Sequence, residues 1–85
     1  MRAGDYEGAL PFLEQAVAKL RGTGSFDEAY ADYNLASTRL QLGRCDGVKD
    51  LLKNSQHIQG HRSEIDSALA QEKAQCHGGG NAEGD

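Results

Sequence analysis

Apolar residues recur at steps of three and four along most of this 85-residue chain. The first such stripe comprises Ala9, Leu10, Leu13, Ala16, Val17 and Leu20. Residues at these steps share one face of an α-helix, so the spacing excludes most β-structures at the outset. Ala, Leu, Glu, Gln and Arg, which favour helices, are common, whereas Val and Ile are scarce. The sequence therefore predicts an all-α fold.

Capping residues and glycines divide the chain into helices. Asp5 suits the N-cap of a first helix, in which Pro11 introduces an early kink. Ser25, followed three residues later by Glu28, has the spacing of a capping box that begins a second helix. Gly43 ends that helix, and Asp46 suits the N-cap of a third, shorter one.

We expect residues 1–76 to form one domain with about four helices, over residues 5–20, 26–42, 46–54 and 61–76. Residues 55–60 are predicted to be a linker. The short connections imply that neighbouring helices are antiparallel. Residues 77–85 are Gly-rich, polar and aperiodic, so this tail is predicted to be disordered.

Three segments resemble parts of the tetratricopeptide repeat (TPR), a helix–turn–helix unit. Residues 4–10, followed by Leu13 and Ala16, resemble the second helix of one repeat. Residues 33–36, leading to Leu40 and Gly43, resemble the first helix of the next, and residues 43–48 its second helix. The resemblance implies an antiparallel α-α superhelix fragment of about one and a half repeats, with residues 61–76 as a C-terminal capping helix.

The same resemblance implies a scaffold for protein–protein interaction that binds a peptide or a protein partner. In this family the first helix of a repeat lines the binding groove. Carried onto this chain, the implied peptide-binding residues are Tyr30, Tyr33, Asn34, Ser37 and Gln41. The alternative for Tyr33 and Tyr30 is a packing role, in which Tyr33 fills the core beside Ala9 and Tyr30 is half-buried. The alternative function is structural: a self-assembly element that forms homo-oligomers through its uncovered terminal helix.

Cys45 and Cys76 are predicted at the start of the third helix and the end of the fourth. Antiparallel packing of these helices brings those two ends together, so a disulfide is geometrically feasible. Two free thiols are the other interpretation, and the sequence leaves both open because the compartment is unknown. His57, His61 and His77 near Cys76 match no common zinc-ligand spacing, so no metal site is expected.

Composition and missing motifs argue against several other functions. The formal net charge is −4, the pI is near 5.2, and the nine Lys and Arg residues are scattered, which argues against nucleic-acid binding. No apolar run approaches the length of a membrane span, so membrane insertion is not expected. No nucleophile–base motif or cofactor loop is present, so we expect no enzyme activity and no cofactor. The acidic residues are expected on solvated helix faces and caps: Asp27, Glu28, Asp32, Asp46, Asp50, Glu64, Asp66 and Glu72.

Overall fold

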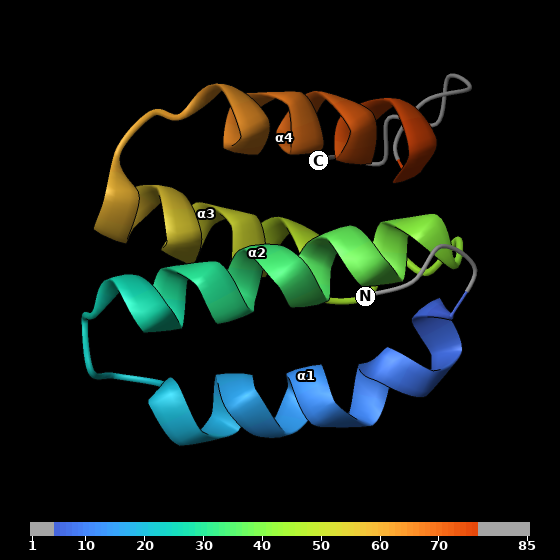
Figure 1. The fold of residues 1–85 in the computed structure, drawn as a ribbon. Coiled ribbons are helices and arrows are strands. Elements are labelled where there is room, and N and C mark those ends of the chain that lie inside the picture. Colours follow the sequence, from blue (N-terminus) through green and yellow to red (C-terminus); the bar gives the residue numbers. More distant parts are fainter. Residues whose placement is uncertain (1–4, 77–85) are drawn as a thin grey trace.

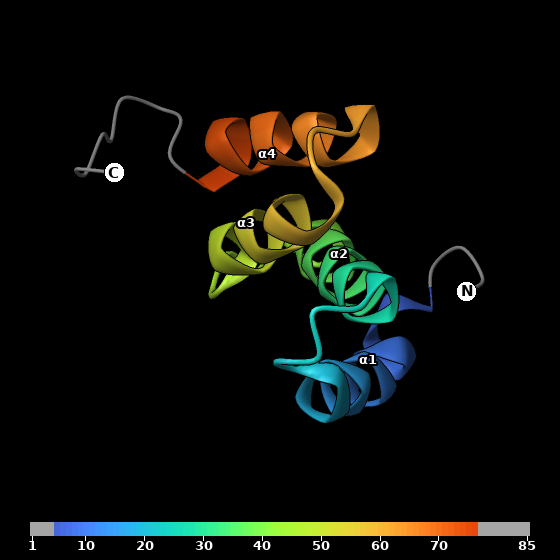
Figure 2. The same ribbon diagram turned by 90° about the vertical axis from the view of Figure 1, so that its left-hand side faces the viewer.

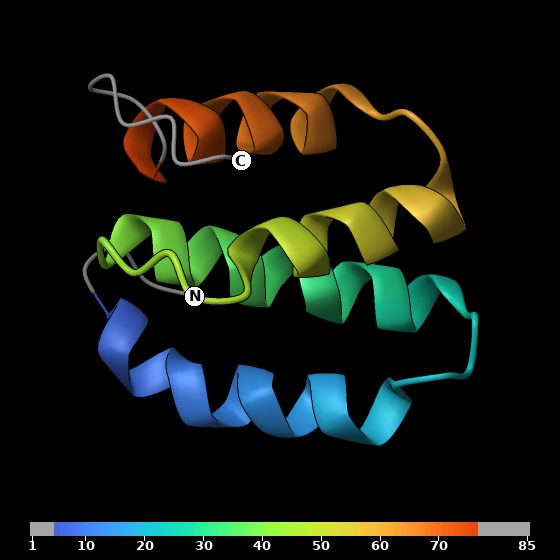
Figure 3. The same ribbon diagram turned by 180° about the vertical axis from the view of Figure 1, so that it is seen from behind.

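The computed structural model describes residues 5–76, which form an all-α fold without strands. The helices are α1 (Tyr6–Leu20), α2 (Phe26–Gln41), α3 (Val48–Gln59) and α4 (Ser63–Cys76). Successive helices run in opposite directions, as Figures 1 and 3 show from opposite sides. The prediction of four antiparallel helices is therefore confirmed for this range. The predicted tail and Gly4 of the repeat resemblance lie outside the described residues.

Helix α2 occupies the centre of the fold and packs against each of the other three helices. On one side, Leu10 and Val17 of α1 form an apolar cluster with Ala31 and Leu35 of α2. On the other side, a second cluster joins α2, α3 and α4. We call it the three-helix cluster; its buried members are Ala36, Leu40, Val48, Leu52 and Ala68. Figure 2 shows the result, with α1 and α4 on opposite sides of the α2–α3 pair.

The start of α2 follows the predicted cap only in part. The Ser25 Oγ accepts a hydrogen bond from the Glu28 backbone N–H at 3.2 Å, as the capping box requires. The Glu28 carboxylate, however, turns into the preceding loop. It accepts hydrogen bonds from the backbone N–H of Gly24 at 2.7 Å and of Gly22 at 3.2 Å. Glu28 therefore fixes the α1–α2 turn, whose glycines have positive φ angles.

Of the two predicted aspartate caps, one is in place and the other is wrong. Asp5 occupies the N-cap of α1 as predicted, although its side chain makes no capping hydrogen bond. Asp46 does not begin α3, because Gly47 occupies the N-cap in the left-handed region with φ of 73°. The Asp46 carbonyl instead accepts a hydrogen bond from Arg39 Nη1 at 3.0 Å, and α3 starts two residues later than predicted.

The predicted linker over residues 55–60 is also wrong, because α3 continues through Ser55 to Gln59. Ser55 is fully buried, and its Oγ donates a hydrogen bond to the Ala29 carbonyl of α2 at 2.8 Å. Its Oγ also accepts a hydrogen bond from Gln59 Nε2 at 3.0 Å. The small, satisfied hydroxyl lets α3 pack tightly on α2, and Gly60, with φ of 84°, ends the helix. Helix α4 then starts at Ser63, two residues after the predicted position.

Candidate functional site

One face of α2 carries all five of the predicted binding residues. We call it the aromatic face, and it comprises Phe26, Tyr30, Tyr33, Asn34, Ser37 and Gln41. Asn34 and Gln41 are exposed and Ser37 is half-buried. Tyr33 is also half-buried and has the expected packing role, but it packs against the three-helix cluster, which includes no residue of α1, and not beside Ala9 as the packing interpretation expected. Tyr30 is 60% exposed, so it is not the half-buried residue that the same interpretation expected.

Phe26 is the member of this face that sequence reasoning missed. It opens α2, and 64% of its surface is exposed. Its position four residues before Tyr30 places the two rings one helical turn apart on the same side of α2, and this spacing was the signal that could have identified it. Two adjacent exposed aromatic rings on a face without charged residues form a candidate contact surface.

The opposite side of α2 forms the floor of a hollow of about 730 Å³ between α1 and α3. Helix α2 contributes a single stripe to it, made of Glu28, Asp32, Leu35 and Arg39. The remaining lining residues come from α1, α3 and the turns beside them: Glu14, Val17, Ala18, Arg21, Gly22, Gly47, Asp50, Leu51 and Asn54. Sequence reasoning did not predict this hollow, since its walls depend on how α1 and α3 diverge across α2.

Two acids in this hollow are buried, which corrects the prediction that they lie on solvated faces. Glu28 is 5% exposed and Asp32 is 3% exposed. Asn54 of α3 donates hydrogen bonds from Nδ2 to Glu28 Oε2 at 3.0 Å and to Asp32 Oδ2. The Asn54 side chain therefore links α3 to both carboxylates of α2. Glu72 of α4 is likewise buried, contrary to the same prediction, whereas the other acids in that set are exposed.

The surroundings shift the pKa values of the two carboxylates in opposite directions. Hydrogen bonds from the backbone N–H groups of Gly24 and Gly22, and then from Asn54, hold the pKa of Glu28 below its ordinary value. Burial raises the pKa of Asp32, and the negative charge of Glu28 adds to this rise. Glu28 is therefore stabilised as a carboxylate, whereas Asp32 is a charge that the fold buries at a cost.

Arg39 supplies the other polar contacts of the hollow. Its Nη2 lies 3.4 Å from Glu14 Oε2, and this pair joins α2 to α1. Its Nη1 donates to the Asp46 carbonyl, so the same guanidinium also holds the α2–α3 connection. Arg39 and Glu14 are thus paired between α2 and α1, whereas Glu28 and Asp32 of α2 are bonded to Asn54 of α3.

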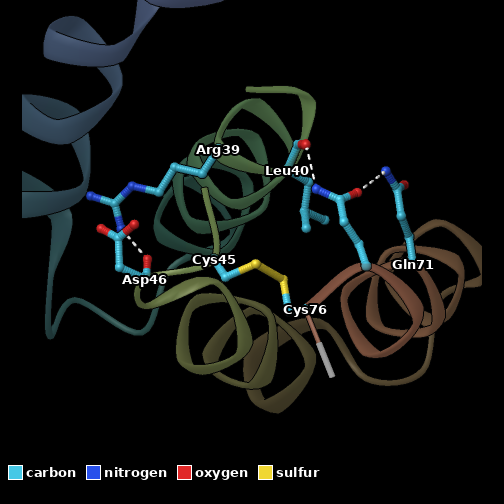
Figure 4. The surroundings of a disulfide bond; sticks show 7 residues. Arg39, Leu40, Cys45, Asp46, Gln71 and Cys76 are labelled. Atoms are coloured by element: carbon cyan, nitrogen blue, oxygen red, sulfur yellow. Dashed lines mark hydrogen bonds between the residues drawn. A yellow bond between two sulfur atoms is a disulfide. The ribbon is translucent and has the colours of Figure 1, made fainter. Parts of the chain in front are cut away.

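A disulfide joins Cys45, in the α2–α3 connection, to Cys76, the last residue of α4 (Figure 4). The two sulfurs are 2.07 Å apart and the two Cα atoms 5.9 Å apart. Of the two alternatives that the sequence left open, the structure contains the bridge. Gln75 Nε2 also donates a hydrogen bond to the Leu40 carbonyl of α2 at 2.9 Å. The bridge thus ties the C-terminal end of α4 to the α2–α3 connection, and the hydrogen bond ties it to the last turn of α2.

Metal-ligand groups and membrane-crossing helices are not found within residues 5–76. No group of three or more His, Cys, Asp or Glu side chains is arranged there to hold a metal ion. His77 lies outside this range. None of the helices in it has both the length and the apolar character that a bilayer crossing requires. Comparisons with protein-family models, curated proteins and solved structures found no match to this chain.

Proposed function

We propose that this chain is a TPR-like, non-catalytic module that binds a protein or peptide partner through the aromatic face of α2. The observation that carries the proposal is the exposed pair Phe26 and Tyr30 on that face. Aromatic side chains dominate the binding energy of many protein interfaces because they bury a large apolar area at a low cost in conformational entropy. The face has no charged member, so apolar and hydrogen-bonding contacts would determine the choice of partner.

The helix order supports the repeat interpretation on which this proposal draws. In that interpretation, α1 is the second helix of one repeat, α2 and α3 form a complete pair, and α4 is the cap. Ala29 and Ala36 of α2 have no exposed surface, as expected where helices approach closely. The central position of α2, in contact with α1, α3 and α4, suits the first helix of an internal repeat.

The aromatic face is a better candidate than the hollow on the opposite side of α2. In the hollow, Arg39 is paired with Glu14, and Glu28 is bonded to the turn and to Asn54. A ligand there would have to compete with these contacts, each of which already holds two elements together. Phe26 and Tyr30, in contrast, keep most of their surface exposed to solvent.

Selection from a displayed peptide library tests this proposal, because the library itself supplies the ligand. Peptides selected on the wild-type protein should bind Tyr30→Ser and Ser37→Trp variants at least about tenfold more weakly. Asp50→Asn, an exposed change beside the hollow, is the matched control and should leave the affinity unchanged. Unchanged affinity in both α2 variants, with their far-UV circular dichroism intact, would contradict the proposal.

Self-assembly through α1 is a second candidate, favoured by one observation. Phe12 is 71% exposed, whereas Leu10 and Val17 of the same helix are buried against α2. A second copy of the chain would cover this ring. Sedimentation equilibrium separates the candidates. A stable dimer that Phe12→Ser converts to a monomer would favour assembly, whereas a wild-type monomer at micromolar concentration would favour the partner-binding module.

A further inference from the structure

We propose that the Cys45–Cys76 bridge is a redox-controlled lock on α4, and that a dithiol reductant releases this helix while α1, α2 and α3 stay folded. The bridge fixes one end of α4, and the connection after Gly60 fixes the other. Without the bridge, the covalent attachment of α4 to the rest of the described fold is through that connection alone.

The noncovalent contacts of α4 are weaker than those that hold α2 to its neighbours. Its buried side chains are Ile65, Ala68 and Glu72, and Leu69 is half-buried against the three-helix cluster, so α4 offers two large aliphatic residues to the core. At its N-terminal end, His61 and Asp66 form an exposed pair at 3.6 Å, and such pairs contribute little to the free energy of folding. The bridge is therefore a large part of what holds α4 in place, and such lightly packed elements open first.

The bridge is open to attack because Cys45 is exposed, whereas Cys76 is half-buried. A thiolate of the dithiol attacks the Cys45 Sγ, the S–S bond breaks, and Cys76 leaves as a thiolate that takes up a proton. The second thiol, once deprotonated, attacks the mixed disulfide and releases the Cys45 thiolate. The reductant becomes a disulfide, and two electrons have passed to the protein.

Release of α4 would uncover the face of α2 and α3 that it now covers. Leu40, Val48 and Leu52 of the three-helix cluster would lose the neighbours that α4 supplies. Tyr33 packs against the same cluster, together with Leu69 and Cys76. Because Tyr33 belongs to the aromatic face, reduction should also weaken partner binding. This last step rests on the proposed function, whereas the release of α4 does not.

Hydrogen–deuterium exchange followed by mass spectrometry tests the lock without any partner. Adding dithiothreitol to the wild-type protein should make peptides from residues 63–76 exchange at least about tenfold faster, and this acceleration should exceed that of peptides from α1 and α2, which open only when the whole fold opens. The Cys45→Ser/Cys76→Ser variant is the matched control. Its α4 should exchange at the fast rate with or without reductant.

Three results would overturn the inference. Both cysteines of the unreduced protein labelling as free thiols would remove the bridge itself. A gain of two hydrogens in intact mass shows that reduction is complete. Unchanged exchange in residues 63–76 after that point would show that noncovalent packing alone is enough to hold α4 in place. Equal acceleration in all helices would show global loosening instead of release of α4. A failed peptide selection would overturn the proposed function but leave this test unaffected.

Discussion

Removing the Cys45–Cys76 bridge should lower the free energy of unfolding by an amount that follows from the size of the loop it closes. The two cysteines are 31 residues apart. In the chain-entropy account, closing such a loop restricts the unfolded chain by about 3.7 kcal/mol at room temperature. A chain of 85 residues has a total stability of roughly 4–13 kcal/mol at the usual value per residue. The bridge therefore accounts for a large fraction of the free energy of unfolding.

Urea unfolding followed by far-UV circular dichroism measures this loss. The Cys45→Ser/Cys76→Ser variant should unfold at a lower urea midpoint, and wild-type protein with dithiothreitol should behave like it. The dependence of the free energy on urea should become steeper, because an unbridged chain exposes more surface when it unfolds. A loss below about 1 kcal/mol, with the bridge confirmed by mass in the wild type, would refute this reasoning.

Three further predictions concern the buried acids and the aromatic face. Glu28→Gln should lower stability at neutral pH. That deficit should shrink as the pH falls from 4.5, the ordinary pKa of a glutamate, through the lowered pKa of Glu28. Protonation then removes the carboxylate charge that the wild-type fold stabilises. Asp32→Asn should raise stability at neutral pH, and the gain should disappear as the pH falls through the raised Asp32 pKa towards 3.8. Urea midpoints measured across this pH range check both directions of change. The predictions would be contradicted if the stabilities of the two variants, each relative to the wild type, changed with pH in the same direction. Tyr33→Ala should cost about 1–3 kcal/mol and also weaken peptide binding, whereas Ser37→Trp should weaken binding alone; equal urea midpoints for Tyr33→Ala and the wild type would contradict the packing role.

Local sequence patterns were enough to predict the number and order of the helices in the described range. Apolar residues spaced three and four apart, ending with Val17 and Leu20, indicate α1, and Ser25 correctly marks the start of α2. Because adjacent helices are antiparallel, the start of the third predicted helix lies near the end of the fourth. The sequence therefore predicts that Cys45 and Cys76 can pair. These features depend on residues close in sequence, or on the simple rule that short connections produce antiparallel neighbours.

Features that depend on contacts between helices could not be predicted in the same way. Ser55 resembles a loop residue because it is small and polar, but the Ala29 carbonyl of α2 satisfies its hydroxyl and allows α3 to continue. Glu28 and Asp32 have the sequence pattern of solvated acids, yet Asn54 lies opposite them and bonds to both. No local pattern specifies which side chain of α3 lies against which side chain of α2.

Mapping a selected peptide on the protein by nuclear magnetic resonance tests the central claim most directly, that the partner-binding surface is the aromatic face of α2. In titrations of ¹⁵N-labelled protein, the largest amide shifts should belong to Phe26, Tyr30, Asn34 and Ser37. Shifts concentrated in residues 14–22 and 47–54, which line the hollow, would contradict the claim and place the site on the opposite side of α2.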